Sequence, residues 1–239
     1  MDNKFIRTQM LLGSDAMNKL KNSHVAVFGI GGVGGYTVEA LVRSGIGSID
    51  IIDSDTVDES NINRQIYATV STIGQYKTDV AKKRILDINP DINVTAHRIF
   101  YTPETEHLFD FSKYDYIADA IDTVTGKIAL AVNAEKSGTP IISSMGAGNK
   151  LCPEMFEVAD IYQTSICPLA RVMRHELKKR NIKSLKVVYS KETARTPLQI
   201  DGAAANSGEK PVPASSAFVP SVVGLIMASQ IIKDITGCE

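Results

Sequence analysis

The sequence predicts an α/β fold in which a mostly parallel central sheet is flanked by helices, and three observations support this prediction. The run VAVFGIGGVG at residues 25–34 is an apolar strand pattern that ends in closely spaced glycines, with a helical pattern directly after it. Strand and helix patterns alternate through the first 144 residues, as they do in βαβ units. Asp53 ends the second strand pattern about 20 residues beyond the glycines, where a carboxylate can bind a ribose. Together these features describe a Rossmann-like sheet.

Composition indicates a soluble globular protein. The 239 residues are 44% hydrophobic with a net charge of -1, and no linker or repeat divides them, so we expect one domain over residues 1–239. The first ten residues lack the apolar core of a signal peptide, which favours a cytoplasmic location. Prolines interrupt the uncharged run 211–232, leaving less than the roughly 18 to 20 residues that span a bilayer. We therefore expect no membrane association.

The first elements follow from the apolar pattern. Residues 1–22 are expected to form an N-terminal arm with a short helix that Ser14 caps. A strand at 24–28 leads through the glycines to a helix at 32–44, which Gly45 closes. The next strand, at 48–52, completes a βαβ unit.

The middle of the chain continues the alternation. The stretch 74–77 precedes an amphipathic helix that runs to residue 88, where Asn89-Pro90 stops it. We expect a strand at 93–99 and an acidic helix at 103–111. A buried strand at 116–121 then delivers Asp122 at its C-terminal end, where ligands collect in open α/β sheets.

The C-terminal third is less regular. A helix at 125–137 leads to a strand at 139–144, and extra antiparallel strands are expected within 150–165. A helix at 168–180 carries proline in its first turn, and a strand follows at 186–189.

Two segments complete the chain. The small, polar, proline-bearing stretch 199–216 is expected to be a mobile surface loop. The strongly apolar C-terminal helix, 220–236, suits either the core or a dimer interface.

The glycines predict a phosphate-binding turn. Gly29, Gly31, Gly32 and Gly34 let the backbone approach a phosphate, while the helix N-terminus supplies positive potential. A glycine pattern of this kind also serves dehydrogenases, methyltransferases and flavoproteins, or simply makes a tight turn. It therefore predicts a nucleotide without naming the reaction.

Three residues after the βαβ unit narrow the choice of nucleotide. Arg64 and Lys77 supply two cations that a triphosphate needs and a dinucleotide pyrophosphate held by backbone amides does not. Asp122 is placed to hold Mg²⁺. This set would neutralise a pyrophosphate leaving group and permit attack at the α-phosphorus of ATP, which describes adenylation of a carboxylate.

At this level of detail the chain resembles the ATP site of the ubiquitin-activating-enzyme-like superfamily. The resemblance implies that Asp53 contacts ribose, that Arg64 and Lys77 bind phosphates and that Asp122 holds the metal. It also implies a homodimer in which Arg7 reaches the phosphates of the neighbouring subunit. The residues that carry the motifs are Gly29, Gly31, Gly32, Gly34, Asp53, Asp55, Asn61, Arg64, Gln65, Lys77 and Asp122.

A second set of motifs points to one branch of that superfamily. Sulfur-carrier adenylyltransferases usually have two C-x-x-C pairs for zinc, whereas Cys152, Cys167 and Cys238 form none, so no zinc is expected. The segments 160–164, 168–171, 187–192 and 218–221 resemble the tRNA threonylcarbamoyladenosine dehydratase branch instead. That resemblance implies ATP-dependent activation of the threonyl carboxylate beside the tRNA anticodon, followed by cyclisation. It leaves open a sulfur-relay protein partner.

Charge patterning gives separate support for a tRNA substrate. Residues 171–195 contain nine Lys or Arg against two Glu, in a chain whose net charge is -1. A solvated helix face would show the same pattern. The candidates for contacts with tRNA phosphates are Arg171, Arg174, Lys178, Lys179 and Arg180.

Several alternatives remain at the level of sequence. Cys167 before Pro168 is either a reactive thiol at a helix start or a structural cysteine. The main functional alternative is an adenylyltransferase acting on the C-terminal glycine of a ubiquitin-like sulfur carrier. A non-catalytic nucleotide-binding protein and an NAD-dependent oxidoreductase are the other two.

Overall fold

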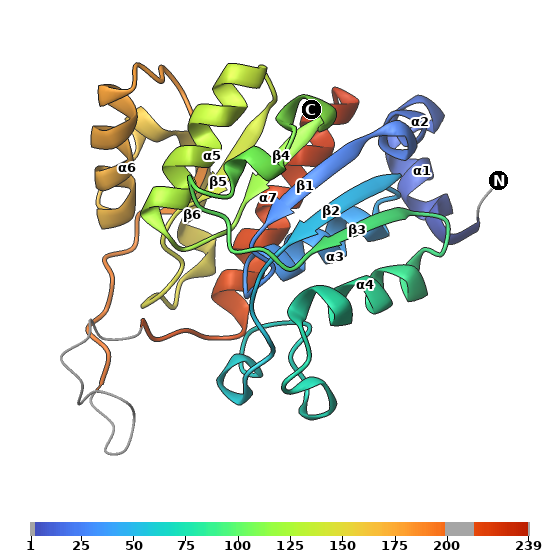
Figure 1. The fold of residues 1–239 in the computed structure, drawn as a ribbon, viewed down its shortest axis with the longest axis horizontal. Coiled ribbons are helices and arrows are strands. Elements are labelled where there is room, and N and C mark those ends of the chain that lie inside the picture. The colour runs from blue at the N-terminus through green and yellow to red at the C-terminus, as the bar shows by residue number, and fades with distance from the viewer. Residues whose placement is uncertain (1–2, 199–212, 239) are drawn as a thin grey trace.

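The computed structural model describes residues 3–198 and 213–238, and within them seven strands form one sheet in the order β3-β2-β1-β4-β5-β7-β6 (Figure 1). All neighbouring strands are parallel except β6 and β7. The strands are β1 (His24–Phe28), β2 (Ser48–Ile52), β3 (Asn93–His97), β4 (Tyr116–Asp119), β5 (Ile141–Ser144), β6 (Phe156–Asp160) and β7 (Lys186–Ser190). This confirms the predicted fold class, with β6 as the antiparallel strand in the C-terminal third.

The strand order places a crevice in the sheet. The chain winds from β1 outward to β2 and β3, then returns to β4 on the other side of β1. Connections on the two sides therefore leave the C-terminal ends of β1 and β4 in opposite directions. A ligand crevice is expected at this switch point.

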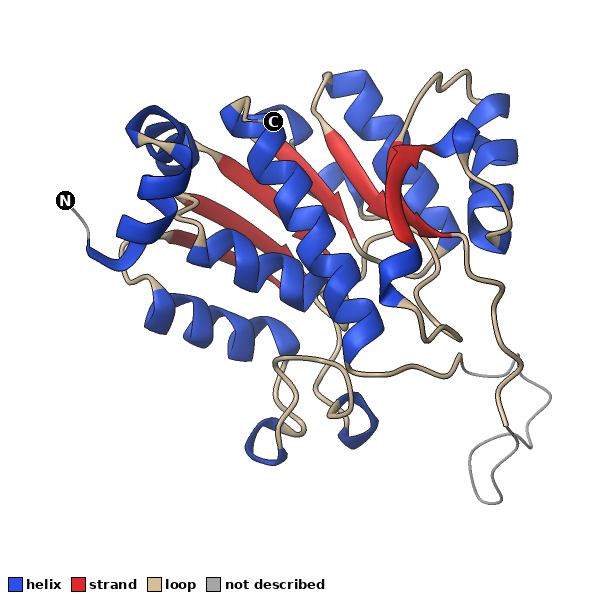
Figure 2. Cartoon of the chain, turned by 180° about the vertical axis from the view of Figure 1, so that it is seen from behind, coloured by secondary structure: helices blue, strands red, loops and turns tan. Residues whose placement is uncertain are grey.

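Helices cover both faces of the sheet. Helices α3, α4 and α7 cover the face seen in Figure 2, whereas α5 and α6 lie on the face seen in Figure 1. The helices are α1 (Ile6–Leu12), α2 (Ser14–Asn22), α3 (Gly34–Arg43), α4 (Lys77–Ile88), α5 (Val124–Ser137), α6 (Pro168–Lys179) and α7 (Phe218–Thr236). Val38 and Leu41 of α3 share one buried cluster with Val223 and Met227 of α7.

Helix α7 is long and apolar enough to cross a membrane by length and composition. Of its most apolar 18-residue window, 39% is buried within this fold. Its Gly224 lies so close to α3 that a Cβ there would be 2.3 Å from the Val33 carbonyl oxygen. One face of α7 therefore belongs to the core of this fold.

The predicted acidic helix at 103–111 is wrong. The structure has two 3₁₀ turns there, η4 (Glu106–Leu108) and η5 (Phe111–Lys113). Side chains compete with the helix for local backbone groups, since Thr105 Oγ1 accepts from the Thr102 N–H and the Asp110 carboxylate accepts from the Ser112 N–H. Phe109 and Phe111 both pack against Phe28 of β1. The segment thus covers the sheet with aromatic rings instead of a helix.

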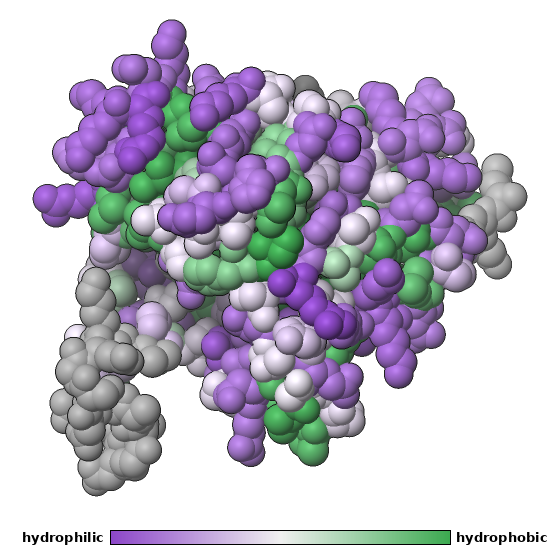
Figure 3. Space-filling model, viewed as in Figure 1, coloured by the Kyte–Doolittle hydropathy of each residue, from purple (hydrophilic) through white to green (hydrophobic). Residues whose placement is uncertain are grey.

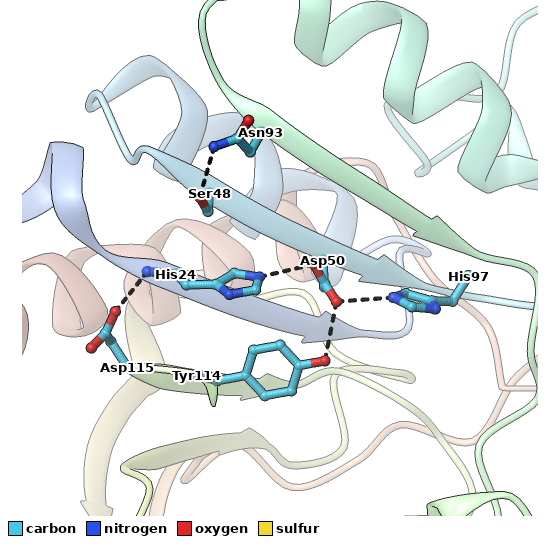
Figure 4. Close-up of polar contacts among 7 residues, drawn as sticks. All are labelled: His24, Ser48, Asp50, Asn93, His97, Tyr114 and Asp115. Carbon is cyan, nitrogen blue, oxygen red and sulfur yellow. Dashed lines mark hydrogen bonds and ion pairs between the residues drawn. The ribbon is translucent and has the colours of Figure 1, made fainter. Parts of the chain in front are cut away.

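Part of the sheet beside this segment carries a polar network. The Asp50 carboxylate of β2 is 2.9 Å from Nε2 of both His24 and His97, and it accepts a 3.1 Å hydrogen bond from the Tyr114 hydroxyl (Figure 4). Burial would raise the pKa of Asp50, but the bonds to His24 and His97 outweigh burial and lower it well below its usual value. This network joins β1, β2 and β3 on the face opposite α3.

Smaller predictions also need correction. Gly13, not Ser14, occupies the N-cap of α2, and the Ser14 hydroxyl pairs with the side chain of Gln9 instead. Strand β4 ends at Asp119, so Asp122 lies in the following turn. Of the surface loop expected at 199–216, residues 199–212 lie outside the described part of the chain.

Candidate active site

A cavity of about 880 Å³ opens at the C-terminal ends of β1, β2 and β4, where the strand order predicts a crevice. Segments far apart in the sequence meet there, including the start of α4 and the approach to α7. Ten of the residues that the motifs single out line this cavity: Gly29, Gly31, Gly32, Asp53, Asp55, Asn61, Arg64, Gln65, Lys77 and Asp122.

The glycine turn is packed too tightly for side chains at two positions. Gly29 has φ +81°, and a Cβ there would lie 2.8 Å from the Ala120 carbonyl oxygen. A Cβ on Gly34 would lie 1.8 Å from the Gly29 carbonyl oxygen. Gly34 therefore supports the turn from beneath rather than lining the cavity, and the N-terminus of α3 points toward the cavity floor.

Asp53 ties the end of β2 to the glycine turn. One of its carboxylate oxygens accepts a 2.9 Å hydrogen bond from the Ile30 N–H and the other a 2.9 Å bond from the Asp55 N–H. Burial raises the pKa of Asp53, and the nearby charge of Lys77 and the two backbone bonds only partly offset that effect. The carboxylate is thus held in one orientation at the cavity wall.

Lys77 is almost fully buried at the start of α4. Its ammonium donates a 2.7 Å hydrogen bond to Asp55, whose side chain is 61% exposed. The Lys77 backbone N–H also donates to the Asp55 carbonyl oxygen at 3.0 Å. The cation therefore reaches the cavity from below with its position fixed.

Arg64 lies in a turn with its own internal bonds. Its Nη1 donates to the Ser60 carbonyl oxygen at 2.8 Å and to Asn63 Oδ1 at 2.9 Å. Asn61 stabilises the same turn, because its side chain accepts from the Asp58 N–H while Asp58 accepts from the Ser60 N–H. The turn places Arg64 in the cavity lining, with the Arg64 Cγ beside Gly32.

Asp122 differs from the other cavity residues because its carboxylate is exposed and makes no hydrogen bond or ion pair with any described residue. It lies in the turn between β4 and α5, next to the buried Asp119. An anionic group with free oxygen atoms at a cavity wall is available to a cation or a donor of a ligand.

Three aromatic residues of the cavity escaped sequence reasoning. Tyr76, Phe100 and Tyr101 line its wall, and Phe100 is 54% exposed. The Arg98 guanidinium lies 4.4 Å from the centroid of the Tyr76 ring and also binds the Asp79 carboxylate through two nitrogens. The aromatic pair directly after β3 was the signal that could have revealed this wall, since that strand ends at the same edge.

Arg7 lies outside the cavity. It is exposed on α1, which lies beyond the N-terminal end of β1, whereas the cavity opens at the opposite end of that strand (Figure 1). Within one chain the residue therefore cannot contact a ligand in the cavity.

The basic candidates form a surface on α6, here called the α6 basic surface: Arg171, Arg174, Lys178, Lys179 and Arg180. Hydrophilic side chains gather over this helix in Figure 3. Lys179 and Arg180 both bind Glu176, and Arg174 donates to Thr164. Arg171 and Lys178 are exposed, and their side chains bind no described residue. The excess of positive charge is therefore real but partly neutralised.

The three cysteines Cys152, Cys167 and Cys238 are unpaired, and Cys167 is buried at the N-cap of α6. No group of three or more His, Cys, Asp or Glu side chains in the described ranges is arranged to hold a metal ion. A metal at this cavity would therefore need ligand atoms from a bound substrate as well as from Asp122.

Comparisons with known proteins agree with this geometry. The model of the ThiF family matches residues 5–239. The tRNA threonylcarbamoyladenosine dehydratase of Bacillus subtilis is 45% identical over 244 residues, which cover 98% of this chain and 95% of that protein. A crystal structure of the Escherichia coli tRNA N6-threonylcarbamoyladenosine dehydratase TcdA with AMP has a TM-score of 0.88 at 33% identity and covers 98% of this chain and 94% of that one. The complex of TcdA with ATP has a TM-score of 0.87 at 31% identity.

Proposed function

The chain belongs to the ThiF family, as its motifs predict, and from that membership we propose that it is an ATP-dependent tRNA threonylcarbamoyladenosine dehydratase. The observation that carries the proposal is the cavity, where the glycine turn, Arg64, Lys77 and the unpartnered Asp122 surround one space. A redox dinucleotide would not need these charges. The adenylation of a carboxylate does.

The reaction has two steps. In the first, a carboxylate oxygen of the threonyl group attacks the α-phosphorus of ATP, the bond to the β-phosphate oxygen breaks, and pyrophosphate leaves. In the second, an amide nitrogen or oxygen of the same modified nucleoside attacks the activated carbonyl carbon, the amide gives up its N–H proton to solvent, and AMP leaves with the carboxylate oxygen. One water is thereby lost from the nucleoside, and neither step requires a protein nucleophile such as Cys167.

Each charged residue has a role that its environment supports. Asp53, fixed by two backbone N–H groups, would accept hydrogen bonds from the ribose hydroxyls. Lys77 and Arg64 would neutralise charge that develops on the leaving pyrophosphate. The bonds to Asp55 and Asn63 would hold Lys77 and Arg64 at the cavity wall, where both cations would face the triphosphate.

Magnesium fits the remaining carboxylate. Mg²⁺ is usually bound by one or two carboxylates together with phosphate oxygens and water, and Asp122 offers two oxygen atoms that no described residue occupies. When bound, the ion would supply positive charge at the phosphates. Asp122 would hold it at the cavity wall.

A homodimer is part of the proposal because Arg7 cannot reach the cavity of its own chain. Arg7 on α1 would extend into the cavity of a second copy and complete the set of cations around the triphosphate. The exposed Met10 and Leu11 on the same helix, 81% and 83% exposed, supply apolar area for that contact.

The substrate is proposed to be tRNA, held near its anticodon loop by phosphate contacts to the α6 basic surface. Reversing Lys178, Lys179 and Arg180 to glutamate should weaken tRNA binding and flatten its dependence on salt. Unaltered binding would leave the helix as an ordinary solvated face. The enzyme would act in the cytoplasm, and a sulfur-relay partner remains open.

Mass spectrometry of anticodon-loop nucleosides tests the function directly. After incubation of threonylcarbamoyladenosine-containing tRNA with ATP, we expect the nucleoside to lose the mass of one water, and we expect Asp122→Ala to abolish the loss. An unchanged nucleoside, together with adenylation of a carrier protein that ends in diglycine, would instead favour the sulfur-carrier adenylyltransferase. Pyrophosphate exchange that requires ATP would exclude the oxidoreductase and the passive nucleotide-binding protein.

A further inference from the structure

An ion pair lies fully buried beneath the turn that carries Asp122. The Lys127 ammonium is 3.1 Å from both carboxylate oxygens of Asp119, and each side chain is 1% exposed. Asp119 is the last residue of β4, and Lys127 is in the first turn of α5. The pair therefore closes the loop of chain between them.

The ion pair is also tied to the next strand. Lys127 Nζ donates to the Ser144 carbonyl oxygen at 2.8 Å and to the Ser143 hydroxyl at 3.3 Å, and that hydroxyl donates to Asp119. The Ile121 N–H, which belongs to the residue before Asp122, donates to Asp119 Oδ1 at 3.3 Å. Three elements, β4, α5 and β5, thus share one network of directional bonds.

The turn above this network packs against the glycine turn and lines the cavity. Its Ala120 backbone packs against Gly29, and the Ala120 side chain packs against Gly34. At its other end a Cβ on Gly126 would lie 2.6 Å from the Ile121 side chain, so the turn has little room to change shape. A shift of the turn would therefore move Asp122 and the glycine turn together.

We propose that Asp119 and Lys127 are positioning residues that hold the turn of residues 120–126 in the shape in which Asp122 faces the nucleotide phosphates. Hydrophobic residues of similar volume would stabilise this part of the core at least as well, because burying two charges costs solvation free energy that their attraction does not always repay. The ion pair adds hydrogen bonds of defined geometry, which an apolar contact does not provide. Bonds of fixed geometry hold a catalytic group within the narrow range of positions that phosphoryl transfer tolerates. The inference rests on the proposed role of Asp122.

The test uses the double variant Asp119→Asn, Lys127→Met, which removes both charges and leaves neither one unpaired. The dissociation constant of ATP is measured with Mg²⁺ and with EDTA, and the ratio of the two values gives the tightening that magnesium provides. We expect this ratio to be about tenfold smaller in the double variant than in wild type, close to the ratio for Asp122→Ala. The affinity of the double variant for ATP in EDTA should stay within about threefold of wild type.

Hydrogen–deuterium exchange supplies a readout that does not depend on nucleotide. Peptides that cover residues 119–127 should exchange about tenfold faster in the double variant, while peptides that cover β2 exchange as in wild type. The matched control is Asp50→Asn, which disrupts another buried carboxylate network away from the turn and should lower the melting temperature. It should keep the magnesium-dependent tightening.

Wild-type tightening together with wild-type exchange in the double variant would overturn the proposal and leave the ion pair as a core contact. If the double variant does not fold, Ser143→Ala removes one bond to Asp119, and we expect a smaller loss of tightening in the same direction. A wild-type enzyme that leaves tRNA unchanged but binds Mg²⁺ and ATP would overturn the proposed function alone. If Asp122→Ala keeps the tightening, Asp122 does not hold the metal. The exchange rates then test by themselves whether Asp119 and Lys127 hold the turn.

Discussion

The nucleotide cavity and the α6 basic surface both gather charged side chains, but they hold them in different ways. In the cavity Lys77 is 5% exposed and bonded to Asp55, and Asp53 is held by two backbone N–H groups. On α6, Arg171 and Lys178 extend into solvent without a partner among the described residues. Lys77 and Asp53 are thus held by the protein itself, whereas Arg171 and Lys178 would be ordered only by a ligand.

This difference predicts two kinds of binding. Groups fixed in a partly buried cavity act at a low effective dielectric, and they lose little entropy when a ligand binds. Exposed cations are screened by salt, and their contribution comes mainly from the release of counterions from the nucleic acid. Substitutions in the cavity should therefore change the rate or abolish binding, while those on α6 should change the affinity for tRNA in a salt-dependent way.

The largest effect is expected at the glycine turn, where Gly34→Ala tests whether the order of the cavity is needed. The added Cβ would lie 1.8 Å from the Gly29 carbonyl oxygen, so the turn must move. We expect ATP affinity to fall at least about 100-fold, a loss of about 2.7 kcal/mol, by isothermal titration calorimetry. Gly146→Ala is the control, because a Cβ there meets no atom within 4 Å. Tight ATP binding by Gly34→Ala would mean that the turn is not preorganised.

Arg64→Ala tests whether a half-buried cation of the cavity contributes to catalysis. Its loss should slow adenylation by about 100-fold, because one donor to the charge on the leaving pyrophosphate is removed. The melting temperature should change little, since the side chain is only half-buried. Single-turnover release of pyrophosphate measures the rate, with Arg43→Ala, an arginine that binds Glu39 outside the cavity, as the control. An unchanged rate would remove Arg64 from the mechanism.

Much of the cavity could be predicted from the sequence, because its glycines and charged residues lie in short patterns whose spacing is visible along the chain. The strand before Gly29 and the positions of Asp53 and Asp122 near the ends of strands all follow from the switch point of a parallel sheet. Ten of the residues indicated by these patterns and by the family resemblance line one cavity.

What escaped prediction depends on contacts between distant segments. The aromatic wall of Tyr76 and Phe100 exists because the start of α4 meets the end of β3. The pairing of Lys127 with Asp119 joins α5 to the end of β4, and no sequence motif predicts it. The failed helix at 103–111 shows the same limit, since its phenylalanines pack on Phe28 of a strand about 80 residues earlier. Sequence separation hides such contacts from pattern reasoning.

A moderate effect is expected on the α6 basic surface when the two cations without partners are reversed. The variant Arg171→Glu, Lys178→Glu should weaken tRNA binding about tenfold and reduce the slope of log affinity against log salt by about 1.5. Filter binding at salt concentrations from about 50 to about 300 mM measures both the affinity and the slope. Lys82→Glu, Lys83→Glu on α4 makes the same change in net charge on exposed lysines elsewhere. Equal loss in both variants would show that only net charge matters.

The smallest effect is expected at Glu176, which neutralises part of the α6 basic surface. Hydrogen bonds from Lys179 and Arg180 lower the pKa of Glu176 to about 2. Because the folded-state pKa is depressed, the carboxylate stays charged and paired at neutral pH, and this pairing is lost only as pH falls toward about 2. Glu176→Gln frees both cations, so tRNA should bind about twofold more tightly, by the same amount from pH 5 to pH 8. Asp87→Asn on α4, which removes one exposed negative charge, is the control. A gain in affinity that appears only above pH 6 would show that a group other than Glu176 controls how tightly the α6 basic surface binds tRNA.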